Sequence, residues 1–346
     1  MGDARLTISG GRLASCRSRA EASVAFAGMV DVPARLRRLV EELEEEVGHA
    51  PDPFGPVGAM VLEEIDRARR PHVHERRVVS SGVVVAPSTN PDGWAAGTQL
   101  EITRGTIEAT DPDRMRLFAD GLSSWVVRHL DGGDEWMVFD RPSGSERDLV
   151  VLAEVLGATV VQRHPTGAVR VVGARGVARW DGVRWHHEPP AASWIDTVTA
   201  CDPHGDVTVV RALLEFAVHD LGSRGIGALL IYRPDGEPGP PVEARLPSPP
   251  PLQIRRPTGL APLRHALAQI DGAAVFDADG VLRELGVRLV PSAEAEAEVD
   301  GYRGMRHTAA RRYSFDDPTA TVIVVSEDGP VSVLRKGRVL GSSTPA

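Results

Sequence analysis

The sequence predicts an α/β protein with two domains, of which the first is α+β-like and the second holds a mixed β-sheet flanked by helices. The chain has 346 residues, a length that favours two domains. Apolar residues spaced three or four apart alternate with short, unbroken apolar runs, which indicate helices between buried strands. Pro189 and Pro190 separate two such series, so we expect a tail at 1–30 and domains at 31–189 and 190–346.

The composition is that of a globular protein with a formal net charge of -9. Cys16 and Cys201 are too few for a disulfide framework or a zinc site, so we expect a cytoplasmic protein. No stretch approaches the length of apolar sequence that a membrane span needs, and we expect none. The negative charge, and the lack of sequence for a further module after 190–346, argue against a nucleic-acid partner.

Caps and spacing predict the elements of the first domain. Asp31 is the expected N-cap of an amphipathic helix that ends at Gly48. Asp111 is expected to open a helix that reaches Leu130. Asp181-Gly182 predicts a hairpin between two strands. Further helices are expected at 57–70 and 145–156, and strands at 77–86, 135–140, 158–163, 168–172, 176–180 and 183–187.

The second domain is expected to begin with a helix that Asp206 caps and that ends at Gly222. Nine of the 25 residues at 234–258 are proline, which predicts an extended loop. The hairpin of the domain is expected to turn at Asp277–Gly280. A further helix is expected at 260–269, and strands at 225–232, 271–276, 281–289 and 320–325.

A basic segment near the end of the chain indicates a polyanionic ligand. Between Gly301 and Arg312 there are four arginines and His307 but no acidic residue, although the whole chain is acidic. Arginine offers a planar fork of donors that suits phosphate oxygens. The glycines at 301 and 304 would leave a helix N-terminus open to an anion. The alternative is an ordinary basic helix face in contact with solvent.

Carboxylates stand at the ends of two expected strands. Asp271 begins one strand, and Ser326 and Glu327 follow another. If the two strands run antiparallel, these residues share one edge of the sheet. Carboxylates at such an edge could hold a divalent metal, because Mg²⁺ binds through one or two carboxylates together with substrate phosphates. The alternative for Asp271 is a cap at the start of a strand.

Three patches, Asp271-Gly272-Ala273, Met305-Arg306-His307-Thr308 and Ser326-Glu327, together resemble the signature of the diadenylate cyclase domain family. Members of that family join two ATP molecules into cyclic di-AMP. The resemblance implies a diadenylate cyclase-like fold for 190–346, ATP as substrate and Mg²⁺ or Mn²⁺ as cofactor. It also implies at least a homodimer, because each domain holds one ATP. The position of 31–189 ahead of such a domain indicates a regulatory or sensing module.

The resemblance implies roles for the charged residues. Asp271 matches the family aspartate that binds metal beside the attacking 3′-hydroxyl. Arg306 and His307 match a pair that contacts phosphate, and the histidine is also a plausible neighbour of the metal. Ser326 and Glu327 match residues that contact phosphate and metal. The implied catalytic residues are therefore Asp271, Arg306 and His307, and the implied metal ligands are Asp271, His307 and Glu327.

The resemblance also implies contacts with the nucleotide base and sugar. Gly272 and Ala273 match small residues against which the nucleotide packs, and the backbone of Leu289 matches the group that contacts the adenine edge. The chain departs from the family at two positions. Where the family has Thr-Arg-His-Arg, this chain has Met305 at the first position and Thr308 at the last.

These departures remove one hydroxyl and one guanidinium from the expected phosphate site, and each hydrogen bond to a charged group contributes about 1.5–3 kcal/mol. Arg312 lies one helical turn after Thr308 and could supply the missing charge. The departures at Met305 and Thr308 also motivate an alternative function, a catalytically degenerate sensor that binds a nucleotide or cyclic dinucleotide without turnover.

Overall fold

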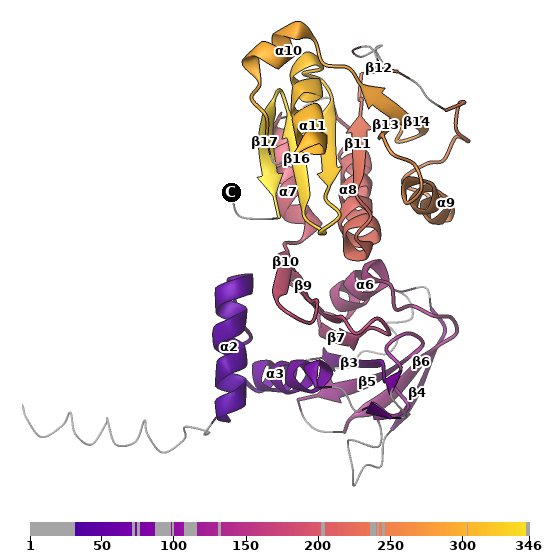
Figure 1. Cartoon of the computed structure of the whole chain (residues 1–346). Coiled ribbons are helices and arrows are strands. Elements are labelled where there is room, and N and C mark those ends of the chain that lie inside the picture. Colours follow the sequence, from indigo (N-terminus) through magenta and orange to yellow (C-terminus); the bar gives the residue numbers. More distant parts are fainter. Residues whose placement is uncertain are drawn as a thin grey trace, which may run out of the picture.

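The computed structural model shows two α/β bodies stacked end to end, each a mixed β-sheet with helices packed against it (Figure 1). This architecture confirms the predicted fold class. The structure describes residues 32–343 apart from 71–72, 75–76, 87–97, 99, 107–115, 131–132, 202–204, 236–239, 241, 244–245 and 303. The tail expected at 1–30 lies outside the described residues. None of the helices in the described part of the chain combines the length and apolarity that crossing a bilayer requires.

Two helices open the first domain. Helix α2 (Ala34–Val47) buries Leu36 and Leu39 and ends at Gly48, whose φ of 81° suits a residue without a side chain. The expected N-cap at Asp31 is wrong, because Pro33 holds the N-cap position and no side chain caps this end. Helix α3 (Pro56–Arg69) follows and packs against α2.

The first sheet has the strand order β10-β9-β8-β7-β3-β5-β6-β4. Strands β3 and β5 pair in parallel, and the other neighbours pair antiparallel. Its strands are β3 (Ser81–Ala86), β4 (Ile102–Thr106), β5 (Ser124–His129), β6 (Glu135–Phe139), β7 (Thr159–Arg163), β8 (Val169–Gly173), β9 (Gly176–Trp180) and β10 (Trp185–Glu188). A separate short hairpin joins β1 (Val73–His74) to β2 (Arg77–Val78).

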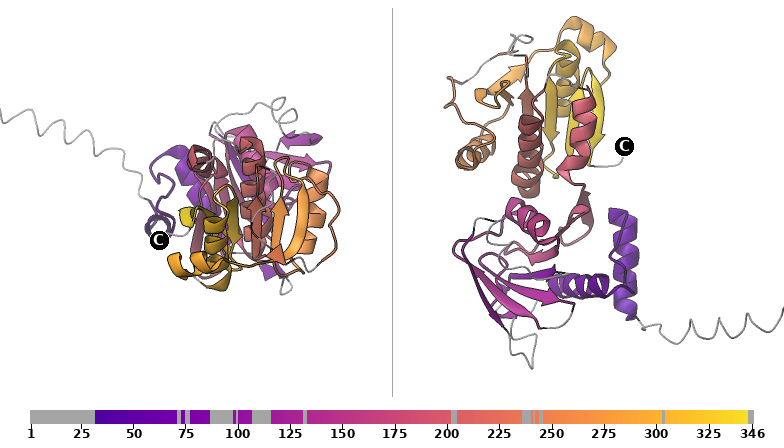
Figure 2. Two further views of the ribbon diagram at one scale, coloured as in Figure 1. Left: turned by 90° about the horizontal axis from the view of Figure 1, so that it is seen from above. Right: turned by 180° about the vertical axis from the view of Figure 1, so that it is seen from behind.

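Helices cover both faces of this sheet. Val83 and Val85 of β3 pack with α2 and α3, whereas Val84 between them packs with α6 (Glu146–Leu156) on the other face. This alternation follows from the pleat of a strand, which points successive side chains to opposite faces. The sheet is therefore the middle of three layers (Figure 2).

The helix expected to reach Leu130 is wrong in its second half, where the chain forms strand β5. The Asp120 carboxylate accepts hydrogen bonds from the backbone N–H groups of Leu122, Ser123 and Ser124 at 2.8, 2.8 and 2.9 Å. This turn stops any helix before β5 begins. The aromatic and β-branched residues that follow in β5 are buried and suit a strand.

The second sheet has the order β12-β14-β13-β11-β15-β16-β17. Strand β11 lies between β13, which runs parallel to it, and β15, which runs antiparallel. Leu229 of β11 pairs with Ala273 on one side and Val324 on the other, so the start of β13 and the end of β15 share one edge. The strands are β11 (Ala228–Tyr232), β12 (Val242–Glu243), β13 (Ala273–Phe276), β14 (Leu282–Leu289), β15 (Thr321–Val325), β16 (Val331–Arg335) and β17 (Arg338–Ser342).

This sheet too is the middle of three layers. One face packs against α7 (Ala191–Cys201), α8 (Val207–Glu215) and α9 (Pro257–Leu267), and the other against α11 (Met305–Asp316). Helix α10 (Ala293–Glu298) leads into α11. The sequence patterns did not predict α7, α10, β16 or β17.

A π-helix continues α8 where the second domain contacts the first. The sequence predicted one helix to Gly222, but the hydrogen-bond pattern changes at η1 (Phe216–Leu221), and a 3₁₀ turn, η2 (Gly222–Arg224), ends the segment. All six residues of η1 are buried. Segments of this kind are rare and often mark functional sites.

A buried charge cluster joins η1 to the first domain. The Glu146 carboxylate accepts hydrogen bonds from Arg179 at 2.6 and 2.7 Å and contacts His219 Nδ1 of η1 at 2.9 Å. Burial raises the pKa of Glu146, but Arg179 and His219 outweigh that effect and hold it at about 2. Beside this cluster, Arg147 donates to Asp220 of η1 at 2.8 Å.

Glu188 lies at the other side of Arg179, with 3.5 Å between Oε1 of the acid and Nη1 of the arginine. Burial raises the pKa of Glu188 to about 7, although Arg179 opposes the shift. Between the ordinary value of 4.5 and about 7, the folded protein therefore holds a proton that the unfolded chain releases. In this window the contribution of Glu188 to stability falls as the pH rises.

We expect Glu188→Gln to remove this pH dependence. The variant should melt at a higher temperature than the parent at pH 8, where the parent must bury a charged carboxylate, and the difference should shrink at pH 5. Thermal unfolding at both pH values measures the effect, with Glu243→Gln at an exposed carboxylate as control. An equal difference at both pH values would contradict the assignment.

Candidate functional site

Three segments meet at the edge of the second sheet where β11 begins and β15 ends. The Arg306 guanidinium lies 3.6 Å from the Glu327 carboxylate. A Cβ atom at Gly227 would lie 2.4 Å from Nη1 of Arg306 and 2.8 Å from Cγ of Glu327, so any other residue here would displace at least one of these side chains. Because the Arg306 side chain is 33% exposed and that of Glu327 is 75% exposed, a ligand can reach both.

Asp271 stands at the same edge, at the start of β13. The sequence predicted that Asp271 and Glu327 share one edge if their strands run antiparallel. This condition is met, because β13 and β15 run antiparallel with β11 between them. Neighbouring strands are about 4.8 Å apart, so Asp271 lies roughly 10 Å from the end of β15. The Asp271 side chain is exposed, and one of its oxygens accepts the backbone N–H of Gly272 at 3.1 Å.

Gly272 brings two backbone segments close together beside Asp271. Its φ is +119°, and a Cβ atom there would lie 2.7 Å from the backbone carbon of Gly286 in β14. The next residue, Ala273, is buried in the sheet. Gly272, which is expected to pack against a nucleotide, therefore allows the close approach of β13 and β14.

Helix α11 begins near Arg306. Gly304 precedes it with φ at +107°, and no side chain caps its N-terminus. The Thr308 hydroxyl accepts the backbone N–H of Tyr302 at 3.0 Å and donates to the carbonyl of Gly304 at 2.9 Å. Thr308 therefore fixes the loop that leads into the helix. The N–H groups of the first turn can bind an anion.

The basic residues of α11 do not all face this edge. Arg312 donates to the carbonyl of Val299 at 3.2 Å, which directs its guanidinium toward α10, and Arg311 donates to the carbonyl of Gly337 at 2.7 Å. His307 is buried, with its ring 6.0 Å from that of Tyr302 in an edge-on arrangement. Of the described arginines in this helix, Arg306 is the one that pairs with Glu327.

The remaining expected residues lie in the backbone of the sheet and its turns. Leu289 ends β14 and pairs with Val242 of β12. Ser326 follows β15, where its N–H donates to the carbonyl of Pro330 and its carbonyl accepts the N–H of Gly329, both at 2.9 Å. This turn positions Glu327 beside Arg306. The nucleotide-binding roles of Leu289 and Ser326 stay predictions.

The expected metal ligands suit an ion that binds together with the substrate phosphates better than an ion that the protein holds alone. Among the described residues, no group of three or more histidines, cysteines or acids is arranged to hold a metal ion. The structure does not place Asp271, His307 and Glu327 in such a group. An exposed carboxylate such as Asp271 suits Mg²⁺, which usually keeps several waters and shares its coordination with phosphates.

Two family models match the chain. Residues 215–339 match the family described as "DisA bacterial checkpoint controller nucleotide-binding", and 37–188 match the one described as "Probable sensor domain DACNK". Residues 215–339 are a DAC domain. The DAC family typically consists of diadenylate cyclases and binds ATP. The resemblance drawn from the three sequence patches is thus confirmed, and the first domain is a DACNK domain.

The other comparisons add little. A hypothetical membrane spanning protein from Bacillus cereus, known from its crystal structure, is 20% identical and similar over 38% of this chain and 71% of that chain, with a TM-score of 0.28. A likeness at that level carries no argument. A search of the curated proteins finds no match.

Sequence patterns did not indicate the part that Gly227 plays at the site. The sequence placed Gly225 and Gly227 at the start of a buried strand. The resemblance to the diadenylate cyclase family implied that this segment lies near the nucleotide, and turn chemistry was the alternative. The crowding of Gly227 by Arg306 and Glu327 appears only in the fold. Sequence patterns also missed the charge cluster around Glu146, whose members are distant in sequence.

We expect Gly227→Ala to weaken ATP binding by the DAC domain without unfolding it. The added methyl group would displace the end of the Arg306 side chain, which is flexible enough to move. Loss of a hydrogen bond between a guanidinium and a phosphate costs about 1.5–3 kcal/mol, or roughly tenfold to a hundredfold in affinity. Calorimetric titration with ATP measures the effect.

Gly341→Ala is the matched control for this variant, because the closest atom to its new Cβ, in Trp194, would lie 3.9 Å away. Unchanged ATP affinity in Gly227→Ala would show that Arg306 does not contact the nucleotide.

Proposed function

We propose that the protein is a diadenylate cyclase that condenses two ATP molecules into cyclic di-AMP and releases two pyrophosphates, under the control of its DACNK domain. The observation that carries this proposal is the Arg306–Glu327 pair beside Gly227, at the sheet edge that also bears Asp271. The edge thus combines an accessible guanidinium, which can bind phosphate, with two accessible carboxylates. The DAC family supplies the chemistry.

In each half-reaction, a 3′-oxygen forms a bond to the α-phosphorus of the other ATP while the bond from that phosphorus to pyrophosphate breaks. The proton of the hydroxyl passes to solvent. Arg306 and the first turn of α11 are suited to neutralise the charge on the phosphates, and Asp271 to orient the attacking ribose. Asp271 or Glu327, each together with the phosphates, would hold Mg²⁺ or Mn²⁺, which would add charge neutralisation and lower the pKa of the hydroxyl.

The proposed reaction requires two copies of the domain. One site holds one ATP, and both phosphorus atoms must be attacked, so two domains have to face each other across this sheet edge. Glu327 and Met305 are exposed at this edge, Met305 by 91%. A second copy of the domain can therefore approach them. We therefore propose a homodimer as the active species.

Asp271→Asn tests the catalytic assignment. Cyclic di-AMP formed from ATP with Mg²⁺ or Mn²⁺, identified by mass spectrometry, should fall about a hundredfold or more in the variant, because an amide neither binds a cation well nor carries the needed charge. Asp279→Asn is the matched control, since Asp279 is an exposed acid in the hairpin that follows. Equal activity of parent and Asp271→Asn would remove Asp271 from the mechanism.

Mixing the two proteins tests the dimer. Addition of a tenfold excess of Asp271→Asn to a fixed amount of parent, followed by equilibration, should lower cyclic di-AMP formation, because most parent subunits then face a partner with a defective site. Rates that stay unchanged over the titration would mean that a single subunit completes both bonds.

The second candidate function is a nucleotide or cyclic-dinucleotide sensor without turnover. The observation in its favour is that the Thr308 hydroxyl bonds the Tyr302 and Gly304 backbone and that Arg312 bonds Val299, so neither replaces the missing phosphate ligands in this conformation. Saturable binding of ATP or cyclic di-AMP with no product under either metal would establish this function instead.

A further inference from the structure

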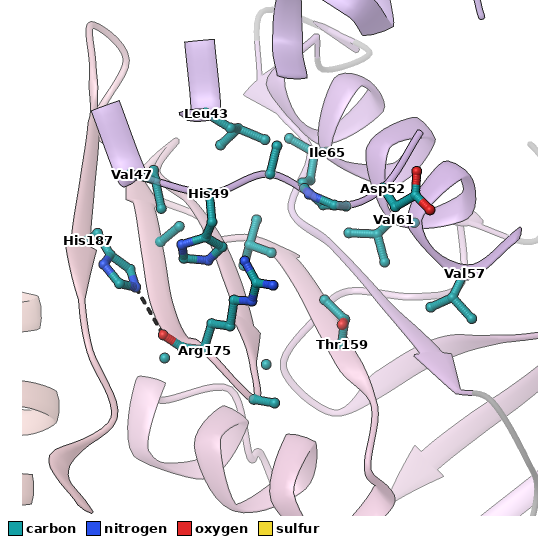
Figure 3. Close-up of a pocket in the computed structure, with 18 residues that line it drawn as sticks. Leu43, Val47, His49, Asp52, Val57, Val61, Ile65, Thr159, Arg175 and His187 are labelled. Atoms are coloured by element: carbon teal, nitrogen blue, oxygen red, sulfur yellow. Dashed lines mark hydrogen bonds between the residues drawn. The ribbon is translucent and has the colours of Figure 1, made fainter. Parts of the chain in front are cut away.

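The DACNK domain contains a cavity of about 310 Å³ between α2, α3 and the sheet (Figure 3). Its walls are largely apolar, with Val47 from α2, Val61 and Ile65 from α3 and Ala178 from β9. Ligand sites in proteins are typically apolar cavities of about 300–1,000 Å³ with a few convergent polar groups. Since a water molecule in the liquid occupies about 30 Å³, the cavity has room for about ten non-hydrogen atoms.

Three basic side chains meet at one end of this cavity. The rings of His49 and His187 are 4.9 Å apart in an edge-on arrangement, and Nε2 of His187 lies 2.9 Å from the carbonyl of Arg175. Figure 3 shows the side chain of Arg175, an exposed residue, extending toward His49. Burial lowers the pKa of His49, and the neighbouring His187 and Arg175 lower it further.

After burial, His187 and Arg175 lower the pKa of His49 because a positive charge on either group disfavours one on the His49 ring. An anion among these three groups would reverse that effect, because it would accept hydrogen bonds from Arg175 and from imidazole N–H groups. A carboxylate has a planar pair of oxygens that matches the donors of the guanidinium fork. The basic end of the cavity is therefore suited to a carboxylate, and its walls to an apolar body.

Asp52 limits the choice further. It lines the cavity on the side away from His187 in Figure 3, near the first turn of α3. One of its carboxylate oxygens accepts the backbone N–H of Phe54 at 3.0 Å, which fixes the side chain in place. A ligand with a second carboxylate at its far end would bring like charges together there, so the cavity disfavours dicarboxylates.

We propose that this cavity is the signal-binding site of the DACNK domain and that it takes a small monocarboxylate with an apolar body. The binding site stands on the geometry of the cavity alone. Its role as a signal rests on the proposed cyclase function.

The cavity has a structural connection to the DAC domain. The turn that joins β8 to β9, including Gly173 and Gly176, lines both this cavity and a second one of about 370 Å³ that reaches His219 of η1. Successive residues of strand β9 face opposite sides of the sheet. Ala178 faces the ligand cavity, and the next residue, Arg179, binds Glu146. A ligand that moves Arg175 therefore acts on the strand that holds the buried charge cluster.

Calorimetric titration of the full chain with octanoate tests the proposal, since octanoate has ten non-hydrogen atoms and one carboxylate. We expect saturable binding that weakens about tenfold or more in Arg175→Gln, because a charge-assisted hydrogen bond is lost. Arg184→Gln is the matched control, an exposed arginine in the β9–β10 hairpin that does not line the cavity. Its affinity should equal that of the parent.

Two ligands of similar length test the selectivity. Octan-1-ol lacks the charge and octanedioate adds a second one. Each should therefore bind at least about tenfold more weakly than octanoate. Octanol binding as tight as that of octanoate, or equal octanoate affinity in parent and Arg175→Gln, would overturn the proposal. So would the absence of octanoate binding by the parent.

Cyclic di-AMP formation separates this proposal from the proposed function. A change in the rate on addition of octanoate, present in Arg184→Gln and absent in Arg175→Gln, would support both. Octanoate binding that depends on Arg175 in a protein that forms no cyclic di-AMP would support the cavity and count against the cyclase alone.

Discussion

The buried carboxylate of Glu146 constrains how the two domains fit together. A fully buried charge is strongly unfavourable unless it is paired, and Arg179 from the first domain and His219 from the second both pair with Glu146. Removal of one partner from a buried pair costs about 3–5 kcal/mol, because the other charge remains. Separation of the domains would expose or unpair this group, so the cluster favours one arrangement of the DACNK domain on the DAC domain.

The sheet edge and its hairpin could be predicted from the sequence because local signals specify them. Unbroken apolar runs mark β11 and β15 as buried strands, and Asp277–Gly280 marks the turn between β13 and β14. Given these strands, antiparallel pairing across β11 places Asp271 and Glu327 at one edge. The family resemblance added the roles, which composition and periodicity alone could not supply.

Other features depend on contacts between distant segments and left no local signal. Glu146 is the first residue of a helix with a capping box, a position where acids are common, and nothing in the sequence distinguishes it from a cap residue. The π-helix has the same apolar spacing as an ordinary helix. Arg312 has the spacing of a residue on the Thr308 face, yet the carbonyl of Val299 binds it, because α10 packs alongside α11.

Only a short segment separates the charge cluster from the candidate site. After η1, the η2 turn brings Gly222 so close to Gly329 that a Cβ atom would lie 2.7 Å from its carbonyl oxygen, and a Cβ atom at Gly225 would lie 3.1 Å from the carbonyl of Glu327. Gly227, which leaves space for Arg306 and Glu327, follows two residues later. Backbone contacts this close cannot absorb a displacement of η1 by small side-chain adjustments. A shift of His219 relative to Glu146 must therefore be accommodated by the turn that carries Glu327 or by the position of Gly227, and either change alters the space around the Arg306 guanidinium.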